Sequence, residues 1–197
     1  FEWGERKAPE ILLKAFNDEF GSSEDVVLIC KAYNQDPAVN IPEQVRNYYL
    51  KDSGGRIVFS INEVVPSYQL GSIYRSVDCF VLATRGEGWG LPIIEAMACG
   101  LPVIATNWSA QSDFISNDTA YLLDVERLRP AEAKCPYYEG FNWAEPSYEH
   151  LRSLMRHVFE NRDEAKTLGV RASAEVLTKW SWEQSVKKIL ARLDELD

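Results

Sequence analysis

The chain has 197 residues, 46% of them hydrophobic, and a formal net charge of −9. This length allows one substantial core but hardly two. The acidic balance and the lack of a basic stripe argue against a nucleic-acid partner, because phosphates select clustered lysine and arginine. No apolar run approaches the roughly 20 residues of a transmembrane helix, so we expect no transmembrane segment. The chain begins in what resembles a strand end, Phe1 to Trp3, and we expect a domain cut from a longer protein.

Strands and helices are predicted to alternate from the N-terminus to residue 123. Short apolar runs such as VVLIC and RIVFSI predict buried strands, and apolar residues at helical spacing predict the helices between them. The expected strands are 26–33, 56–61, 79–83, 102–105 and 121–123. The expected helices are 9–20, 41–50, 66–77, 92–99 and 111–116. This alternation is typical of a Rossmann-like, doubly wound α/β domain with a parallel sheet.

A different pattern follows the last of these strands. Residues 124–146 are rich in proline, glycine and aromatic side chains, and we expect an irregular loop there with a docking or functional role. Residues 147–197 are predicted to form a helical segment, in which Ser147 and Ser181 cap helices. The last helix carries an apolar stripe made of Val186, Ile189, Leu190 and Leu193.

The four cysteines show no C-x-x-C spacing and have no histidine nearby, which argues against a zinc site. Cys30 and Cys79 fall in predicted buried strands, where a free cysteine acts as a small apolar residue. Together with Cys99 and Cys135, they are interpreted as reduced thiols of a cytoplasmic protein.

Residues 78–106 are the most informative stretch; they read DCFVLAT, RGEGWG, LPIIEAMACG and LPVIAT. This order predicts a strand, a glycine loop, a helix and a second strand, which is one βαβ unit. Free N–H groups at the helix N-terminus would open onto the loop and favour an anion there. Glu87 lies in the loop, and Glu95 lies on the helix, where a carboxylate can bond sugar hydroxyls. On chemistry alone, a structural interpretation is equally good. In it, Glu87 is a solvated loop residue, and Glu95 is a first-turn glutamate that complements the helix dipole.

Glycines 86, 88 and 90 do not make a dinucleotide-binding motif. That motif needs G-x-G-x-x-G after the first strand and an acidic residue about 20 positions later. Here the glycines are evenly spaced and follow a late strand. We therefore expect neither a nicotinamide nor any other cofactor.

The segment GWGLPII between Glu87 and Glu95 resembles the glutamate, seven residues, glutamate signature of the family-four retaining glycosyltransferases, also called glycosyl transferases group one. EAMACGLPVIAT, LGSIYRSVDCFVLAT and the later YLL and WAEP segments are similar to that family too, so the resemblance covers nearly the whole chain. It implies the C-terminal, nucleotide-sugar-binding half of a two-domain, B-type enzyme. We therefore expect residues 1–197 to form one donor-binding domain, with the N-terminal acceptor domain absent.

The resemblance also assigns roles to single residues. Glu95 matches the glutamate that holds the ribose hydroxyls of the nucleotide, and Glu87 matches the one that faces the donor sugar. Backbone N–H groups of the loop between them would face the sugar and phosphates; the residues are Gly88, Trp89, Gly90 and Leu91. Ser60, Ile61 and Asn62 match positions where family members contact the base through the backbone.

Two basic residues near the N-terminus match the family's diphosphate-binding loop. Lys7 occupies the position of the family's lysine. Glu2 stands where an arginine is usual, and Arg6 is the neighbouring cation that would take its place. Open α/β folds bind ligands at this mouth of the sheet, where cations neutralise a diphosphate leaving group.

The implied function is transfer of a hexose from a nucleotide-diphosphate sugar to an acceptor, with retention at the anomeric carbon. No metal is expected, because protein cations take its role and the sequence has no Asp-x-Asp site. The last helix of family members commonly braces the N-terminal domain, so its apolar stripe should lie partly exposed here, and the isolated chain should transfer nothing. The alternatives are a nucleotide-sugar epimerase, half of a glycogen-type synthase, and a non-catalytic assembly module.

Overall fold

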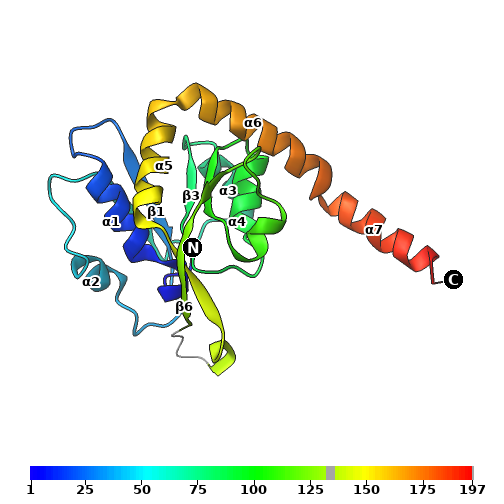
Figure 1. Ribbon diagram of the computed structural model, residues 1–197, viewed down its shortest axis with the longest axis horizontal. Helices are drawn as coiled ribbons and strands as arrows, with labels where there is room; N and C mark the ends of the chain where they lie inside the picture. The colour runs from blue at the N-terminus through cyan, green and yellow to red at the C-terminus, as the bar shows by residue number, and fades with distance from the viewer. Residues whose placement is uncertain (132–135, 197) are drawn as a thin grey trace.

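The computed structural model describes residues 1–131 and 136–196 (Figure 1), so Cys135 lies outside the described residues. The strands of the N-terminal part are β1 (Val27–Ala32), β2 (Arg56–Ile61), β3 (Phe80–Leu82), β4 (Val103–Thr106) and β5 (Tyr121–Leu123). Its helices are α1 (Pro9–Glu19), α2 (Ile41–Arg46), α3 (Ser67–Tyr74) and α4 (Leu91–Ala98), with the 3₁₀ turns η1 (Glu5–Lys7) and η2 (Ser109–Asp113). Strands and helices alternate as predicted.

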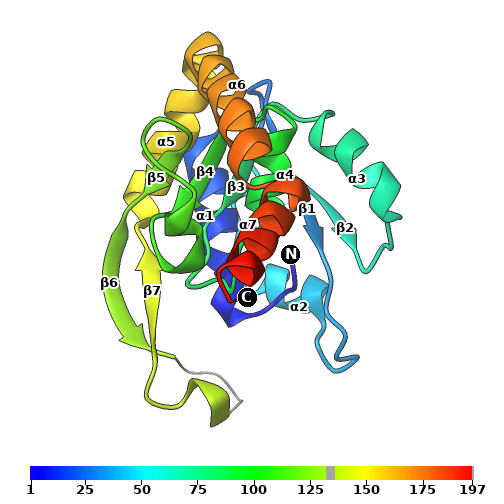
Figure 2. The same cartoon turned by 90° about the vertical axis from the view of Figure 1, so that its right-hand side faces the viewer.

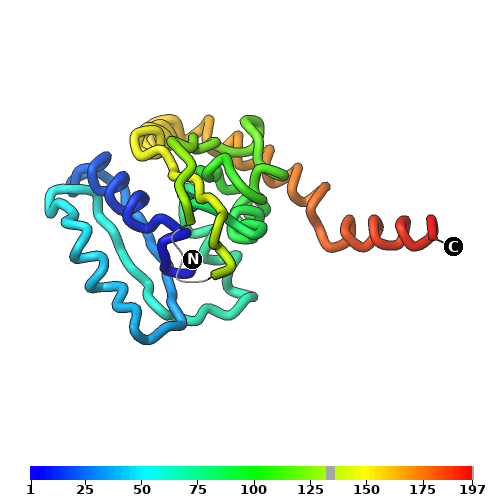
Figure 3. Tube along the Cα trace, turned by 60° about the horizontal axis from the view of Figure 1, so that its bottom comes forward, coloured from blue at the N-terminus to red at the C-terminus, as the bar shows by residue number. Residues whose placement is uncertain are grey.

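Three helices follow the sheet: α5 (Tyr148–Glu160), α6 (Arg162–Lys179) and α7 (Trp182–Asp194). The two predicted caps are confirmed, because Ser147 accepts the His150 N–H and Ser181 accepts the Gln184 N–H. α7 leads away from the rest of the domain (Figure 1, Figure 3), and the residues of its apolar stripe are 49% to 59% exposed, as expected. None of the described helices combines the length and the apolar character that a membrane span requires.

The strands of the main layer pair in parallel. β1 pairs with β2, while β4 lies between β3 and β5. Figure 2 shows β5, β4, β3, β1 and β2 following one another across the domain, so the two hydrogen-bonded groups form one layer. The chain adds β2 on one side of β1 and then β3, β4 and β5 on the other. This reversal is the mark of a doubly wound sheet, and the predicted fold class is confirmed.

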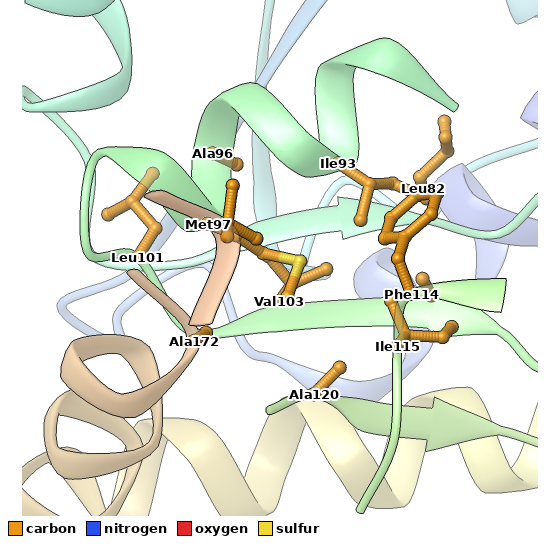
Figure 4. Close-up of a cluster of buried hydrophobic side chains, with 12 residues drawn as sticks. Leu82, Ile93, Ala96, Met97, Leu101, Val103, Phe114, Ile115, Ala120 and Ala172 are labelled. Atoms are coloured by element: carbon orange, nitrogen blue, oxygen red, sulfur yellow. The ribbon is translucent and has the colours of Figure 1, made fainter. Parts of the chain in front are cut away.

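Both faces of this layer are buried, as β4 demonstrates. Val103 packs with Met97 of α4 in one cluster (Figure 4), which also contains Ala105. Ile104 packs with Leu151 of α5 in another cluster. Successive side chains of a strand point to opposite faces, so β4 is covered on both sides and reads as a continuous apolar run. Accordingly, α4 and α6 cover one face, and α1 and α5 cover the other.

The expectation of an irregular loop over residues 124–146 is wrong. β6 (Val125–Pro130) and β7 (Asn142–Pro146) pair antiparallel as a two-stranded hairpin that projects from the domain (Figure 1). The strand pattern is hidden because three of the six residues of β6 are charged. Arg129, for example, is held by ion pairs to Glu145 and Glu5 instead of by an apolar face.

Three predicted helices also differ from the observed ones. The helix expected at 41–50 ends at Arg46, and Tyr49 takes a φ of 53°, which an α-helix does not accommodate. The helix expected at 66–77 is shorter at both ends, and the one expected at 111–116 is the 3₁₀ turn η2. These differences concern boundaries and leave the order of elements unchanged.

α6 approaches the turn between α4 and β4 closely at Gly169. A Cβ at this position would overlap backbone atoms of Gly100, Leu101 and Pro102. Backbone in a tight turn cannot move aside as a flexible side chain does. The missing side chain of Gly169 therefore lets α6 pack against α4, the helix whose N-terminal end faces the candidate site.

Gly169→Ala is expected to lower the free energy of unfolding by about 1–3 kcal/mol through overpacking, although alanine is the better helix former. Urea unfolding followed by circular dichroism measures the change. Gly71→Ala in α3 is the matched control, because a new Cβ there would meet the movable Arg75 side chain at 3.7 Å. Its stability should hold or rise, and equal effects of the two substitutions would contradict the close approach at Gly169.

Candidate functional site

The candidate site lies where the parallel strands end. η1 follows a parallel bridge between Glu2 and Tyr33, just beyond β1, and the glycine loop follows β3. The carboxyl ends of parallel strands share one edge of the sheet, which is the usual place of ligands in doubly wound folds. Ala8 joins η1 to α1 in left-handed backbone (φ 45°), with its small side chain fully buried. Pro9 then begins α1, at a position where its missing N–H costs nothing.

An ion pair joins η1 to the glycine loop. Lys7 Nζ lies 2.5 Å from Glu87 Oε1, although 80 residues separate the two in the chain. Arg6 Nη1 donates to the Gly86 carbonyl at 2.6 Å and lies 3.5 Å from Glu87 Oε2. The side chains of Lys7 and Glu87 are only 11% and 7% exposed, so solvent screens their attraction weakly. The structure thus brings the three expected catalytic residues into contact.

Ser109 of η2 fixes the backbone of Glu87. Its Oγ accepts the Glu87 N–H at 3.2 Å and donates to the Glu87 carbonyl at 2.7 Å. Ser109 has a φ of 71°, a left-handed conformation that costs energy for a residue with a Cβ and that is often retained at functional sites. No role was predicted for Ser109, because a helix was expected to start only at residue 111.

The glycine loop ends at Gly90, which caps α4 with a φ of 87°. Among the described residues, no side chain caps the first N–H groups of α4, so the positive end of the helix dipole opens onto the loop as expected. Gly88 and Leu91 lie exposed on either side of the cap. The Trp89 ring packs on Phe114 and Trp180, with centroid distances of 5.7 and 5.5 Å.

Glu95, one turn into α4, is held by Tyr74 of α3. Tyr74 Oη donates to Glu95 Oε2 at 2.8 Å. Burial raises the pKa of Tyr74, and the hydrogen-bonded Glu95 carboxylate raises it further, so the phenol stays protonated and continues to donate. In the described part of the chain, no hydrogen bond or ion pair joins Glu95 to Lys7 or Glu87. Tyr74 lies in a segment that the sequence marks as family-like, but no role was predicted for it.

The residues expected at the nucleotide base, 60–62, lie at and just beyond the end of β2. Ser60 Oγ donates to Glu63 Oε2 at 2.9 Å. Asn62 has a φ of 56°; its N–H donates to the Ala32 carbonyl at 2.9 Å and its side chain accepts the Asn34 N–H at 3.0 Å. These bonds tie the end of β2 to the end of β1. Within the described residues they do not reach Lys7 or Glu87.

Thr84 and Arg85, directly after β3, are buried polar residues with no predicted role. The Thr84 hydroxyl and the Arg85 N–H both donate to the Arg6 carbonyl, at 3.1 and 2.8 Å. They therefore fasten η1 to the end of β3. The available signal in the sequence is a charged residue placed shortly after an apolar strand, directly before the first glycine of the motif.

Across residues 1–131 and 136–196, no group of three or more His, Cys, Asp and Glu side chains is placed to hold a metal. Cys30, Cys79 and Cys99 are free thiols, and burial raises the pKa of Cys30 to about 11. The charged side chains that meet between the two loops are those of Arg6, Lys7 and Glu87.

Known proteins match this chain in sequence. The family model described as Glycosyl transferases group 1 matches residues 1–133. A D-inositol 3-phosphate glycosyltransferase of Paenarthrobacter aurescens is 37% identical over 78 residues, which are 39% of this chain and 19% of that protein. The sulfoquinovosyl transferase of Arabidopsis thaliana is 28% identical over 121 residues, 61% of this chain and 20% of that protein. The chain thus spans about a fifth of the length of these curated relatives.

Solved structures share the fold. The C-terminal domain of a glycosyl transferase group 1 family protein (LpcC) from Francisella tularensis gives a TM-score of 0.69 at 20% identity, over 92% of this chain and 83% of that one. HepE of Anabaena, solved in complex with UDP, gives 0.71 at 16% identity, over 99% of this chain and 47% of that one. The family match covers well over half of the chain, including the glycine loop and Glu95. This chain therefore belongs to the glycosyl transferases group 1 family.

Proposed function

We propose that this chain is the donor-binding domain of a retaining hexosyltransferase and that it binds a nucleotide-diphosphate sugar at the strand ends. The observation that carries the proposal is the contact of Lys7 and Arg6 with Glu87, on the loop that leads into α4. Cations and free helix N–H groups suit a diphosphate, and a carboxylate suits sugar hydroxyls. The structural neighbour HepE was solved with UDP and with UDP-glucose, which supports a donor of this class.

The cations of η1 would stabilise the departing diphosphate. An ammonium has three N–H donors and a guanidinium has five, so Lys7 and Arg6 keep donors beyond those bonded to Glu87 and Gly86. Negative charge grows on the diphosphate as its bond to the sugar breaks, and cations already in place lower the energy of that transition state. Because protein groups supply the positive charge, the proposed transfer needs no metal.

Glu87 would orient the donor sugar through its hydroxyls. Lys7 holds its carboxylate and Ser109 holds its backbone, so its position is set before the donor arrives. Glu95 would bond the ribose hydroxyls, with Tyr74 keeping the carboxylate in place. Backbone groups of residues 88–91 would meet the sugar and phosphates, and those of residues 60–62 would meet the base.

The acceptor site and part of the catalytic machinery would come from an N-terminal domain of the same enzyme. The length of the curated relatives and the exposed stripe of α7 support this part of the proposal. On this view, residues 1–197 form one donor-binding unit, with 147–197 as its helical segment. The free cysteines among the described residues are in keeping with an enzyme that works in the cytoplasm.

Glu95→Ala is expected to weaken binding of the nucleoside diphosphate about 10- to 100-fold, because charge-assisted hydrogen bonds to the ribose are lost. Calorimetric titration with UDP, GDP and ADP, and with their glucose or mannose conjugates, measures the loss and identifies the base. The 2′,3′-dideoxy form of the bound nucleotide should show no such loss.

Glu175→Ala is the control for this titration, because Glu175 lies on α6 and pairs with Lys179. It should bind as the wild-type chain does. If the wild-type chain binds none of these nucleotides, the donor site is wrong for this domain and a non-catalytic assembly module is favoured.

Lys7→Met should weaken binding of the nucleoside diphosphate about tenfold and leave binding of the corresponding nucleoside unchanged, because Lys7 acts on the phosphates. Calorimetry with both ligands gives the two affinities. Lys179→Met is the control, since Lys179 also pairs with a glutamate, at 2.9 Å on the exposed side of α6. A parallel fall in nucleoside affinity would mean that Lys7 supports the fold instead of the diphosphate.

The isolated chain is expected to transfer nothing, because it would lack the acceptor site. Product formation by the highly purified chain, assayed with labelled donor and candidate acceptors, tests this expectation. Turnover would contradict it. With an N-terminal domain restored, isomerisation of the donor sugar in the absence of acceptor would favour an epimerase over a transferase.

A further inference from the structure

Arg85 carries a buried charge to which the proposed chemistry gives no task. Its side chain is 2% exposed, although it lies on the loop that follows β3. A buried guanidinium is costly unless its donors are bonded and its charge is balanced. The groups that meet this requirement show what Arg85 holds together.

The guanidinium of Arg85 reaches three segments of the chain. Nε and Nη2 donate to the two carboxylate oxygens of Glu145 on β7, at 2.7 and 3.1 Å. Nη2 also donates to Glu10 at the start of α1, and Nη1 donates to the Glu5 carbonyl in η1. Burial acts to lower the pKa of Arg85, but the two carboxylates outweigh it and raise the pKa above its usual value. The charge is therefore permanent, and one rigid fork links η1, α1 and β7.

Arg85 and its neighbour Thr84 also fix the two peptide groups that precede Lys7. Arg85 bonds the Glu5 carbonyl through its side chain and the Arg6 carbonyl through its N–H, and Thr84 adds a second bond to the Arg6 carbonyl. Two consecutive carbonyls are thus held immediately before Lys7. The orientation of η1 decides where the Lys7 ammonium lies, so these bonds set its position.

The β6–β7 hairpin anchors Arg85 from the other side. The Ala144 N–H donates to the Arg85 carbonyl at 3.1 Å. Arg129 of β6 bonds the Glu5 carboxylate and lies 3.6 Å from Glu145. The hairpin lies next to the N-terminal segment in Figure 1. It therefore contacts η1 directly through Arg129 and indirectly through Arg85.

We propose that Arg85 is a positioning residue: braced by Glu145 of the hairpin, it holds η1 in the orientation that places Lys7 at the diphosphate. This inference rests on the proposed function. It expects Arg85 to affect the affinity for the diphosphate, through Lys7, and to leave the affinity for the nucleoside unchanged. A bracket that only stabilised the fold would affect both ligands alike.

Glu145→Gln and Arg85→Lys test the proposal in the 197-residue chain. Glutamine keeps the size of Glu145 and removes its charge, while lysine keeps the charge of Arg85 and lacks the fork. Each variant is expected to bind the nucleoside diphosphate about tenfold more weakly and the nucleoside with unchanged affinity. Combined with Lys7→Met, either substitution should add little further loss, because both act through the same ammonium.

Arg156→Lys is the matched control. Arg156 of α5 makes a comparable fork to Glu19 and Glu24 near the other end of α1, away from the site. Its replacement should lower stability and leave both affinities unchanged. If Glu145→Gln and Arg85→Lys weaken nucleoside and diphosphate binding equally, or weaken neither, the proposal is overturned.

Hydrogen exchange separates a failure of this inference from a failure of the proposed function. The N–H groups of Lys7 and Ala8 bond to the Gly4 and Glu5 carbonyls, each at 3.0 Å. They should exchange faster in Glu145→Gln than in the wild-type chain, while amides of β4 stay protected. If the wild-type chain binds no nucleotide, the proposed function falls, and exchange still decides whether Arg85 holds η1. Unchanged exchange at Lys7 and Ala8 would overturn the inference in either case.

Discussion

The ion pair between Lys7 and Glu87 joins two loops that are distant in the chain. One loop leads into α1, and the other connects β3 to α4. The pair can form only after the parallel strands have brought their carboxyl ends to one edge of the sheet. Because both side chains are nearly buried, separating them costs free energy unless another group takes the place of the lost partner; if Glu87 lost Lys7, it would keep only Arg6, at 3.5 Å. The pair therefore fixes the position of the two loops relative to each other, and the hydrogen bonds of Thr84, Arg85 and Ser109 stabilise that arrangement.

Charge is balanced locally at this edge, even though the whole chain is acidic. Lys7 and Arg6 face Glu87, and Arg85 faces Glu10 and Glu145. In the proposed function, a diphosphate would take donors of Lys7 and leave Glu87 freer to bond the sugar. A ligand with both phosphates and hydroxyls would then satisfy both Lys7 and Glu87, whereas a simple anion would leave Glu87 with Arg6 as its remaining partner. This exchange gives a physical reason for selecting a sugar nucleotide over free phosphate.

α4 links the core to the site. Ile93, Ala96 and Met97 are fully buried at helical spacing, which fixes the rotation of the helix against the sheet and α6 (Figure 4). With that face inside, Glu95 points along the other flank to Tyr74, and Gly90 turns the chain so that the first N–H groups open onto the loop. The roles proposed for the two glutamates depend on this placement, with Glu87 on the loop before α4 and Glu95 on the helix itself. The family-like sequence predicts these positions without showing the partners of the two side chains.

Local patterns in the sequence determined much of this protein. Apolar runs predicted β2 and β5 at their observed bounds, serine caps and helical spacing predicted α5 and α7, and the spacing of Glu87 and Glu95 pointed to the family. Only the tertiary structure decided the hairpin and the supports of the site. The charged strand β6 finds its partners in η1 and β7, and Arg85 bonds residues 60 to 80 positions away. Contacts between such distant positions leave no periodic pattern in the sequence, because they form only when the folded chain brings its distant segments together.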